Sequence, residues 1–112
     1  MSEMSESPVR LEDAAKTFPE TGLVRQVLAR NPTMMLVRHL MEAGWKGARH
    51  SHPHEQMVYV IRGRLRFVCG DRTFEAGAGD SFIVPGGVEH EAAALEAAEV
   101  LDFFVPFRED YV

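Results

Sequence analysis

The sequence contains a single cysteine, no apolar run long enough to cross a bilayer and no excess of positive charge. Because Cys69 is alone, the chain cannot form an intrachain disulfide or a thiolate-rich zinc site. No apolar stretch approaches the ~20 residues that a membrane helix needs, and the first ten residues are acidic and polar. A formal net charge of −5 argues against a broad phosphate-binding surface. These absences favour a cytoplasmic protein with no nucleic-acid partner and no membrane partner.

Length and patterning predict one all-β domain. The 112 residues suffice for a single core, and short β-branched and apolar runs alternate with turn residues about every ten positions from Gly22 onward. We therefore assign residues 1–21 to an N-terminal arm, which packs on the domain or on a partner subunit, and residues 22–112 to a β-barrel or sandwich. The expected strands are residues 23–29, 34–42, 56–61, 65–69, 72–76, 80–84, 89–95 and 99–105.

Three of the five histidines lie in the segment HSHPHEQ, which ends at Gln56. In an extended chain, side chains alternate between faces, so His50, His52, His54 and Gln56 share one face. Pro53 can interrupt this alternation and turn His54 outward. Two imidazoles at positions i and i+2 can converge on one metal ion, at about 2.1 Å from each nitrogen. The segment therefore predicts part of a metal site.

The strand that follows is apolar on both faces. Val58 and Val60 continue the face of the histidines, whereas Met57, Tyr59 and Ile61 occupy the other. This pattern predicts a strand that is buried on two sides.

Two histidines lie outside the cluster. His90 in PGGVEH follows a turn and opens a strand, which makes it the candidate for a further ligand. His39 lies within a strand pattern, where a single histidine is typically a hydrogen-bonded or surface residue, and we do not assign it to the metal site.

An acidic residue, Asp102, interrupts the last apolar strand. Burying a carboxylate costs several kcal/mol unless it is paired or hydrogen-bonded. Asp102 either pairs with Arg108 and holds the C-terminal tail in place, or it faces the metal cavity. Glu109 and Asp110 are interpreted as a solvated tail, and Phe103, Phe104 and Phe107 as core and lid packing.

These residues resemble the cupin superfamily. The first cupin motif, G-x5-H-x-H-x3-E-x6-G, is matched by Gly44, His50, His52, Gln56 and Gly63, with glutamine in place of the usual glutamate. The second, G-x5-P-x-G-x2-H-x3-N, is matched by Gly79, Pro85, Gly87 and His90, with Ala94 in place of asparagine. The resemblance implies a single-domain, jelly-roll-like double-stranded β-barrel with a metal inside its mouth.

Carried over position by position, the resemblance implies the metal ligands His50, His52, Gln56 and His90. Three neutral imidazoles and a neutral amide leave a divalent cation with its full charge. Such an ion attracts anions and is held less tightly than one with a carboxylate ligand. The expected metal ion is nickel, zinc, manganese or iron.

The segment HSHPHEQ and the tail D-x-F-x-P-x-R-E-D, residues 102–110, resemble the pectin-degradation family of small cupins. Members of that family open unsaturated uronates, released by polysaccharide lyases from pectin or alginate, into linear ketouronates. The resemblance implies catalytic roles for Gln56, Asp102 and Arg108, a small anionic sugar-derived substrate, and a homodimer. Arg108 would bind the substrate carboxylate and Asp102 would transfer a proton, while Phe104 would line the substrate pocket.

Two other functions are compatible with this reading. A metal-dependent cupin dioxygenase would require iron and consume oxygen. A non-catalytic sugar-binding or sensing cupin would bind the ligand without converting it. The fold alone does not choose among the three.

Overall fold

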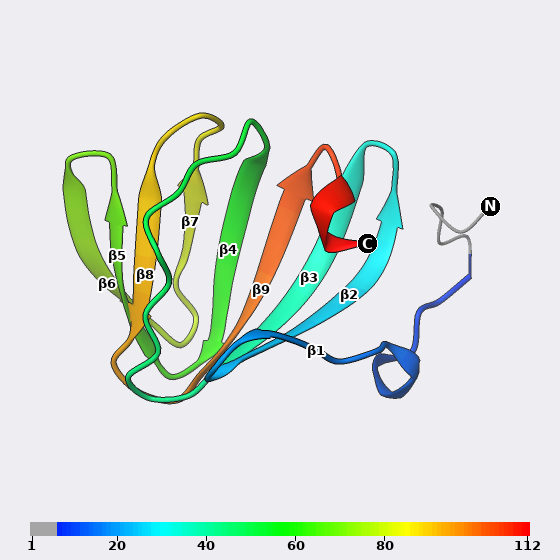
Figure 1. Ribbon diagram of the computed structural model, residues 1–112, viewed down its shortest axis with the longest axis horizontal. Helices are drawn as coiled ribbons and strands as arrows, with labels where there is room; N and C mark the ends of the chain where they lie inside the picture. The colour runs from blue at the N-terminus through cyan, green and yellow to red at the C-terminus, as the bar shows by residue number, and fades with distance from the viewer. Residues whose placement is uncertain (1–6) are drawn as a thin grey trace.

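The computed structural model describes residues 7–112, and their strands form two antiparallel sheets that face each other (Figure 1). The strands are β1 (Thr17–Glu20), β2 (Leu23–Asn31), β3 (Met34–Met41), β4 (Glu55–Arg62), β5 (Arg64–Cys69), β6 (Arg72–Gly77), β7 (Ser81–Val84), β8 (His90–Ala94) and β9 (Ala98–Val105). The only helical elements in this part of the chain are two short 3₁₀ turns, η1 (Leu11–Asp13) and η2 (Glu109–Tyr111). The all-β prediction is confirmed, and each predicted strand lies within two residues of its observed limits. No helix among residues 7–112 is long and apolar enough to span a membrane.

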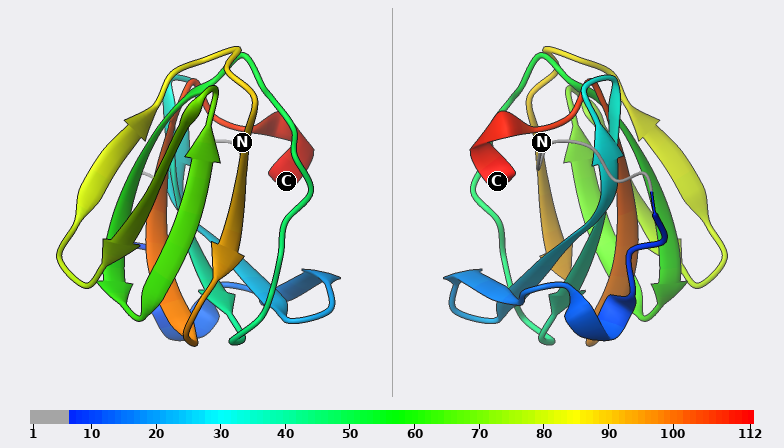
Figure 2. Two further views of the ribbon diagram at one scale, coloured as in Figure 1. Left: turned by 90° about the vertical axis from the view of Figure 1, so that its left-hand side faces the viewer. Right: turned by 90° about the vertical axis from the view of Figure 1, so that its right-hand side faces the viewer.

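The larger sheet has the strand order β1-β2-β3-β9-β4-β7, and the smaller has the order β6-β5-β8. Figure 2 shows the two sheets face to face, with the connection between β3 and β4 passing along the open side of the barrel. This connection runs beside β8, which it contacts through isolated bridges of Lys46 with Ala93 and of His50 with His90. The histidine-rich segment is thereby brought to the opposite sheet from the strand that follows it.

The core fills the space between the sheets. Burial alternates along β3, β4 and β9 with the period of two that a sheet with one buried face requires. The single cysteine, Cys69, is buried in this core.

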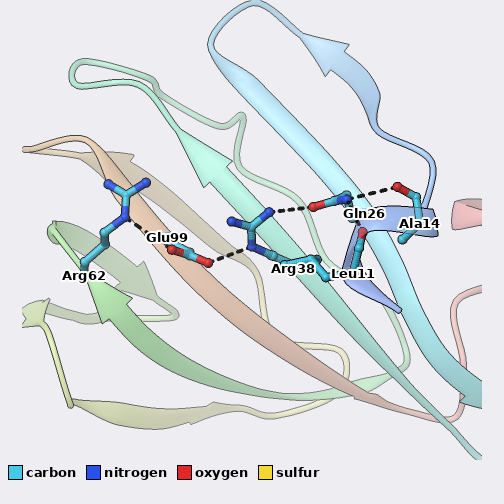
Figure 3. A network of polar contacts seen from close by, with 6 residues as sticks. All are labelled: Leu11, Ala14, Gln26, Arg38, Arg62 and Glu99. Carbon is cyan, nitrogen blue, oxygen red and sulfur yellow. Dashed lines mark hydrogen bonds and ion pairs between the residues drawn. The ribbon is translucent and has the colours of Figure 1, made fainter. Parts of the chain in front are cut away.

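The prediction that β4 is buried on both sides is wrong. Met57 and Tyr59 are each 47% exposed and Ile61 is 39% exposed, because no second sheet lies over the outer face of β4 among residues 7–112. The polar residues of the same sheet are paired with one another: Figure 3 shows a line of contacts from Gln26 through Arg38 and Glu99 to Arg62, with distances of 2.6, 2.7 and 3.2 Å.

The segment assigned to the N-terminal arm contributes an edge strand. β1 pairs with β2, and the Gln26 amide of β2 donates hydrogen bonds to the carbonyl oxygens of Leu11 (3.3 Å) and Ala14 (3.0 Å). The indole of Trp45 donates to Glu20 at 2.7 Å. These bonds attach residues 11–20 to the barrel of the same chain.

The turn from β4 to β5 depends on glycine. Gly63 has a φ of 86°, and a Cβ atom there would collide with the backbone of Ala97 and Ala98. Only glycine allows both the left-handed conformation and this close approach. The cupin motif position at Gly63 therefore has a steric cause in this chain.

Candidate metal centre and the adjoining cavity

Three histidines converge at one end of the barrel. Nitrogen atoms of His50, His52 and His90 lie within 4.8 Å of one another. His50 and His90 exchange two backbone hydrogen bonds, of 3.0 and 2.8 Å, so their side chains are fixed as a cross-strand pair. The predicted histidine ligands are thus brought together from two parts of the chain.

The turn at residues 85–87 positions the second ligand. The backbone N–H of Gly87 donates to the carbonyl of His52 at 2.8 Å, and Gly87 has a φ of 82°. A Cβ atom on Gly86 would collide with the carbonyl of Pro53. The two loops that carry the histidines therefore touch through backbone atoms, which two consecutive glycines permit.

The imidazoles are oriented as metal ligands. The Nδ1 atom of each histidine lies next to a backbone carbonyl: His50 to Ala48 at 2.9 Å, His52 to His54 at 3.0 Å and His90 to Val88 at 3.0 Å. A carbonyl only accepts, so each Nδ1 carries the proton and each Nε2 presents a lone pair. Hydrogen bonds of this kind fix the tautomer and orientation of metal-bound histidines.

Gln56, the fourth predicted ligand, lies beside the histidines, and its orientation is set by Asp102. The buried Gln56 Nε2 donates to Asp102 Oδ1 at 2.7 Å, which directs Oε1 towards the histidines, 3.1 Å from His52 Nε2. Two ligand atoms that are each about 2.1 Å from one ion lie about 3.0–3.4 Å apart. The distance between Gln56 Oε1 and His52 Nε2 therefore fits two ligands of one divalent ion, which the three histidines could also bind.

Burial favours the neutral form of two of these imidazoles, His52 and His90. It lowers the pKa of His52 to about 4, with further lowering by the charges of Arg108 and His90. Burial also lowers the pKa of His90, which the charges of His50 and Arg108 lower further. Neutral imidazoles are the form that binds metal, so proton competition at these two ligands is weak at neutral pH.

Asp102 faces the cavity, one of its two predicted placements. Its carboxylate accepts from Gln56 through Oδ1 and lies 2.6 Å from His39 Nδ1 through Oδ2. The Arg25 Nε–H donates to His39 Nε2 at 3.0 Å. The alternative placement, an ion pair of Asp102 with Arg108, is absent among residues 7–112.

Arg108 instead pairs with Asp110. Its Nε and Nη2 donate to the two carboxylate oxygens of Asp110 at 2.9 and 2.6 Å. Burial lowers the pKa of Arg108, but the opposing effects of Asp110 and Tyr111 together raise it overall. Asp110 is exposed, as predicted for the tail, with 59% of its side chain accessible, but its carboxylate also pairs with Arg108, which the sequence did not indicate.

One donor of Arg108 remains available for a ligand. Arg108 is 7% exposed, and its Nη1 atom is buried with no hydrogen-bond partner among residues 7–112. The guanidinium lies over the rings of Tyr111 and Phe104, with its carbon 4.2 and 5.1 Å from their centroids. A buried cation with an unused N–H group is a recognition element for an anion.

A cavity of about 390 Å³ joins these groups. Its lining includes the metal-site residues His50, His52, Gln56 and His90, the polar residues His39, Asp102 and Arg108, and the aromatic residues Phe104, Tyr111 and Trp45. Phe104 is 1% exposed and its ring packs edge-on against His52 at a centroid distance of 5.7 Å. His54 is only partly buried and its ring packs against that of His52, 5.6 Å between centroids.

The fold and the site define a cupin: two facing antiparallel sheets enclose a histidine cluster assembled from both motifs. The Cupin domain family matches residues 37–104, and the chain belongs to this family.

Several solved structures are similar to this chain. An RmlC-like cupin from Shewanella frigidimarina is 34% identical over 98% of this chain and 99% of its own, with a TM-score of 0.93. KdgF from Halomonas sp. is 29% identical over 96% of this chain and 100% of its own, with a TM-score of 0.90. The polyketide cyclase RemF from Streptomyces resistomycificus, at 20% identity with coverage of 94% and 82% and a TM-score of 0.79, shares the fold. No curated protein matches the chain.

Sequence reasoning missed part of the polar network. Arg25 and His39 are directly opposite each other on β2 and β3, and His39 is a diagonal neighbour of Asp102 across β3 and β9. Tyr111 lies between Arg25 and Arg108, with the guanidinium carbons 3.6 and 4.2 Å from its ring centroid. The alternation that places Asp102 on the inner face also places His39 there, but the pairing of the two strands was needed to connect them.

Proposed function

We propose that this chain is a metal-dependent isomerase that opens a 4,5-unsaturated uronate, of the kind released from pectin or alginate, to its linear ketouronate. The observation that carries the proposal is the position of Gln56, whose amide links the histidine cluster to Asp102. The similarity to KdgF over nearly the whole of both chains supports the same assignment. The residues that bind the ion and those that handle the substrate would therefore act on one molecule in one cavity.

The reaction requires acid–base catalysis without redox change. A proton leaves the hydroxyl at C1 of the ring form, the bond from C1 to the ring oxygen breaks, and a carbonyl forms at C1. The enol released at C5 then becomes a ketone as C4 takes up a proton. Because one proton is removed and one is added, a single carboxylate can serve both steps.

Asp102 is suited to this role. Oδ1 accepts a hydrogen bond from Gln56, and Oδ2 lies at hydrogen-bond distance from His39 Nδ1. The carboxylate is therefore fixed in orientation where it borders the cavity. A divalent ion, when bound, supplies Lewis-acid polarisation of a substrate oxygen. Asp102 would then remove the proton from the hydroxyl and return it to carbon.

Arg108 and Phe104 would hold the substrate. The buried Nη1 of Arg108 can donate to the substrate carboxylate, while Asp110 keeps the guanidinium plane fixed. Phe104 presents an aromatic wall against one face of the sugar ring. The cavity volume of about 390 Å³ is within the range of small-molecule sites.

The test is to add metal-loaded protein to unsaturated galacturonate from a lyase digest and to follow loss of the absorbance of the conjugated double bond. The proposal predicts acceleration over buffer, abolished by chelation and restored by adding the metal back. Asp102→Asn serves as the matched control, because it should keep the metal and lose the activity.

Three results would contradict the proposal. Absence of acceleration by folded, metal-loaded protein would remove the isomerase assignment, and tight binding without conversion would favour the sugar-binding function. Oxygen consumption that accompanies substrate loss would favour the dioxygenase. Product analysis by mass spectrometry separates these cases, because isomerisation leaves the mass unchanged.

A further inference from the structure

The innermost polar network extends beyond the groups that meet the substrate. Asp102 Oδ2 lies 2.6 Å from His39 Nδ1, and His39 is only 6% exposed. On the far side of the ring, Arg25 Nε donates to His39 Nε2 at 3.0 Å. The order is therefore Arg25, His39, Asp102 and Gln56, from β2 across β3 and β9 to β4.

Arg25 determines which nitrogen of His39 carries the proton. A guanidinium N–H can only donate, so His39 Nε2 must be the acceptor and bears no proton. The ring is therefore neutral with its proton on Nδ1, which points at Asp102 Oδ2. Tyr111 lies against the Arg25 guanidinium, 3.6 Å from ring centroid to guanidinium carbon, and limits its movement.

The geometry points to His39 as a positioning residue for Asp102. Gln56 and His39 donate to different oxygens of one carboxylate, so together they fix its rotation about the Cβ–Cγ bond. With His39 absent, Oδ2 would lose its protein donor and the carboxylate could turn away from the substrate hydroxyl. This inference rests on the proposed function, because it assigns His39 to the reaction in which Asp102 transfers the proton.

The test compares two substitutions of His39 in the metal-loaded protein. Asparagine can place its amide nitrogen where His39 Nδ1 lies and so keep the donor to Asp102, whereas leucine has similar bulk and no donor. We expect His39→Leu to lower kcat about 10- to 100-fold, the range for loss of a supporting hydrogen bond, with KM and metal content little changed. His39→Asn should recover most of kcat.

A spectroscopic measurement tests the same geometry without activity. In nitrogen-15 spectra of the metal-free protein, the ring signals lost on His39→Asn should show a protonated Nδ1 and an unprotonated Nε2. The opposite tautomer would overturn the assignment. So would equal kcat for folded, metal-loaded His39→Leu and wild type, or equal losses for His39→Leu and His39→Asn. An inactive wild type with the predicted tautomer would instead refute the proposed function, and the catalytic role of His39 with it.

Discussion

Replacing Gln56 by glutamate would place two carboxylates in contact inside the barrel. In the native site, Gln56 Nε2 donates to Asp102 Oδ1 at 2.7 Å, and both side chains are at least 91% buried. A glutamate has no N–H group to donate, so the Gln56→Glu variant must either hold two negative charges at this distance or take up a proton. The amide at position 56 is thus needed as a hydrogen-bond donor to Asp102.

The magnitudes decide between these two outcomes. At an effective dielectric constant of about 20, two unit charges 2.7 Å apart repel by about 6 kcal/mol. Protonating a carboxyl with an ordinary pKa near 4 costs about 4 kcal/mol at pH 7 and about 1.5 kcal/mol at pH 5. Proton uptake is therefore the cheaper response, and the folded variant binds more protons than its unfolded chain.

The stability deficit of Gln56→Glu should accordingly shrink as the pH falls. We expect the metal-free variant to unfold in urea with up to about 4 kcal/mol less stability than wild type at pH 7 and about 1.5 kcal/mol less at pH 5. With metal bound, the ion should be retained at least as firmly as in wild type, while turnover falls because Asp102 shares a proton with Glu at position 56.

A double variant provides the control. Gln56→Glu with Asp102→Asn exchanges the amide and the carboxylate, which restores a donor opposite an acceptor and leaves an oxygen for His39. Its stability at pH 7 should return towards that of wild type, whereas turnover should not. A deficit of the single variant that is equal at pH 5 and pH 7 would refute the reasoning, as would unchanged turnover.

Three further results are expected. Arg108→Lys should raise KM for the uronate more than tenfold with a smaller effect on kcat, since lysine cannot hold Asp110 in bidentate fashion and also present a donor to the substrate. Steady-state kinetics in which only kcat changed would contradict this role of Arg108. Metal-free protein should lose up to about 3 kcal/mol of stability as the pH falls from 6.5 to about 4. The pKa of His52 is depressed in the folded protein, so the unfolded chain takes up a proton at a higher pH and is stabilised by it. In urea unfolding, His52→Asn should show a smaller loss over the same pH range. Removing a bound ion by chelation should lower the melting temperature. Adding the metal back at 100 times its Kd should restore about 2.7 kcal/mol of stability. A melting temperature that does not depend on metal would contradict the assigned ligands.

Several features of the site followed from the sequence because they depend on spacing along the chain. Alternation on an extended segment placed His50, His52 and Gln56 on one face, and the turn before His90 placed that residue at the start of a strand. The alternation that favoured Gln56 over Glu55 is present in the structure, since Gln56 is buried beside the histidines and Glu55 is exposed on the outer face. The candidate ligands carry no net charge, because imidazole and amide groups are neutral, and this follows from residue type alone.

Other features needed the pairing of distant strands. Asp102 had two placements open, and the register of β9 with β3 and β4 decided between them by setting it near His39 and Gln56. Arg108 had two acidic residues as possible partners, Asp102 and Asp110, and the final 3₁₀ turn places the carboxylate of Asp110 against its guanidinium. Neither result could be read from the local pattern.

The sequence by itself determined the strands, the turns and the identity of the metal-ligand candidates, because side-chain alternation and the conformational limits of glycine and proline act within a few residues. The tertiary structure alone decided which donor meets which acceptor. A buried carboxylate must find hydrogen-bond partners, but any of several donors meets that requirement, and the one that does is set by strands that are more than 40 residues apart in the chain. The same limit applies to β4, whose outer face is as apolar as its inner one and yet is exposed.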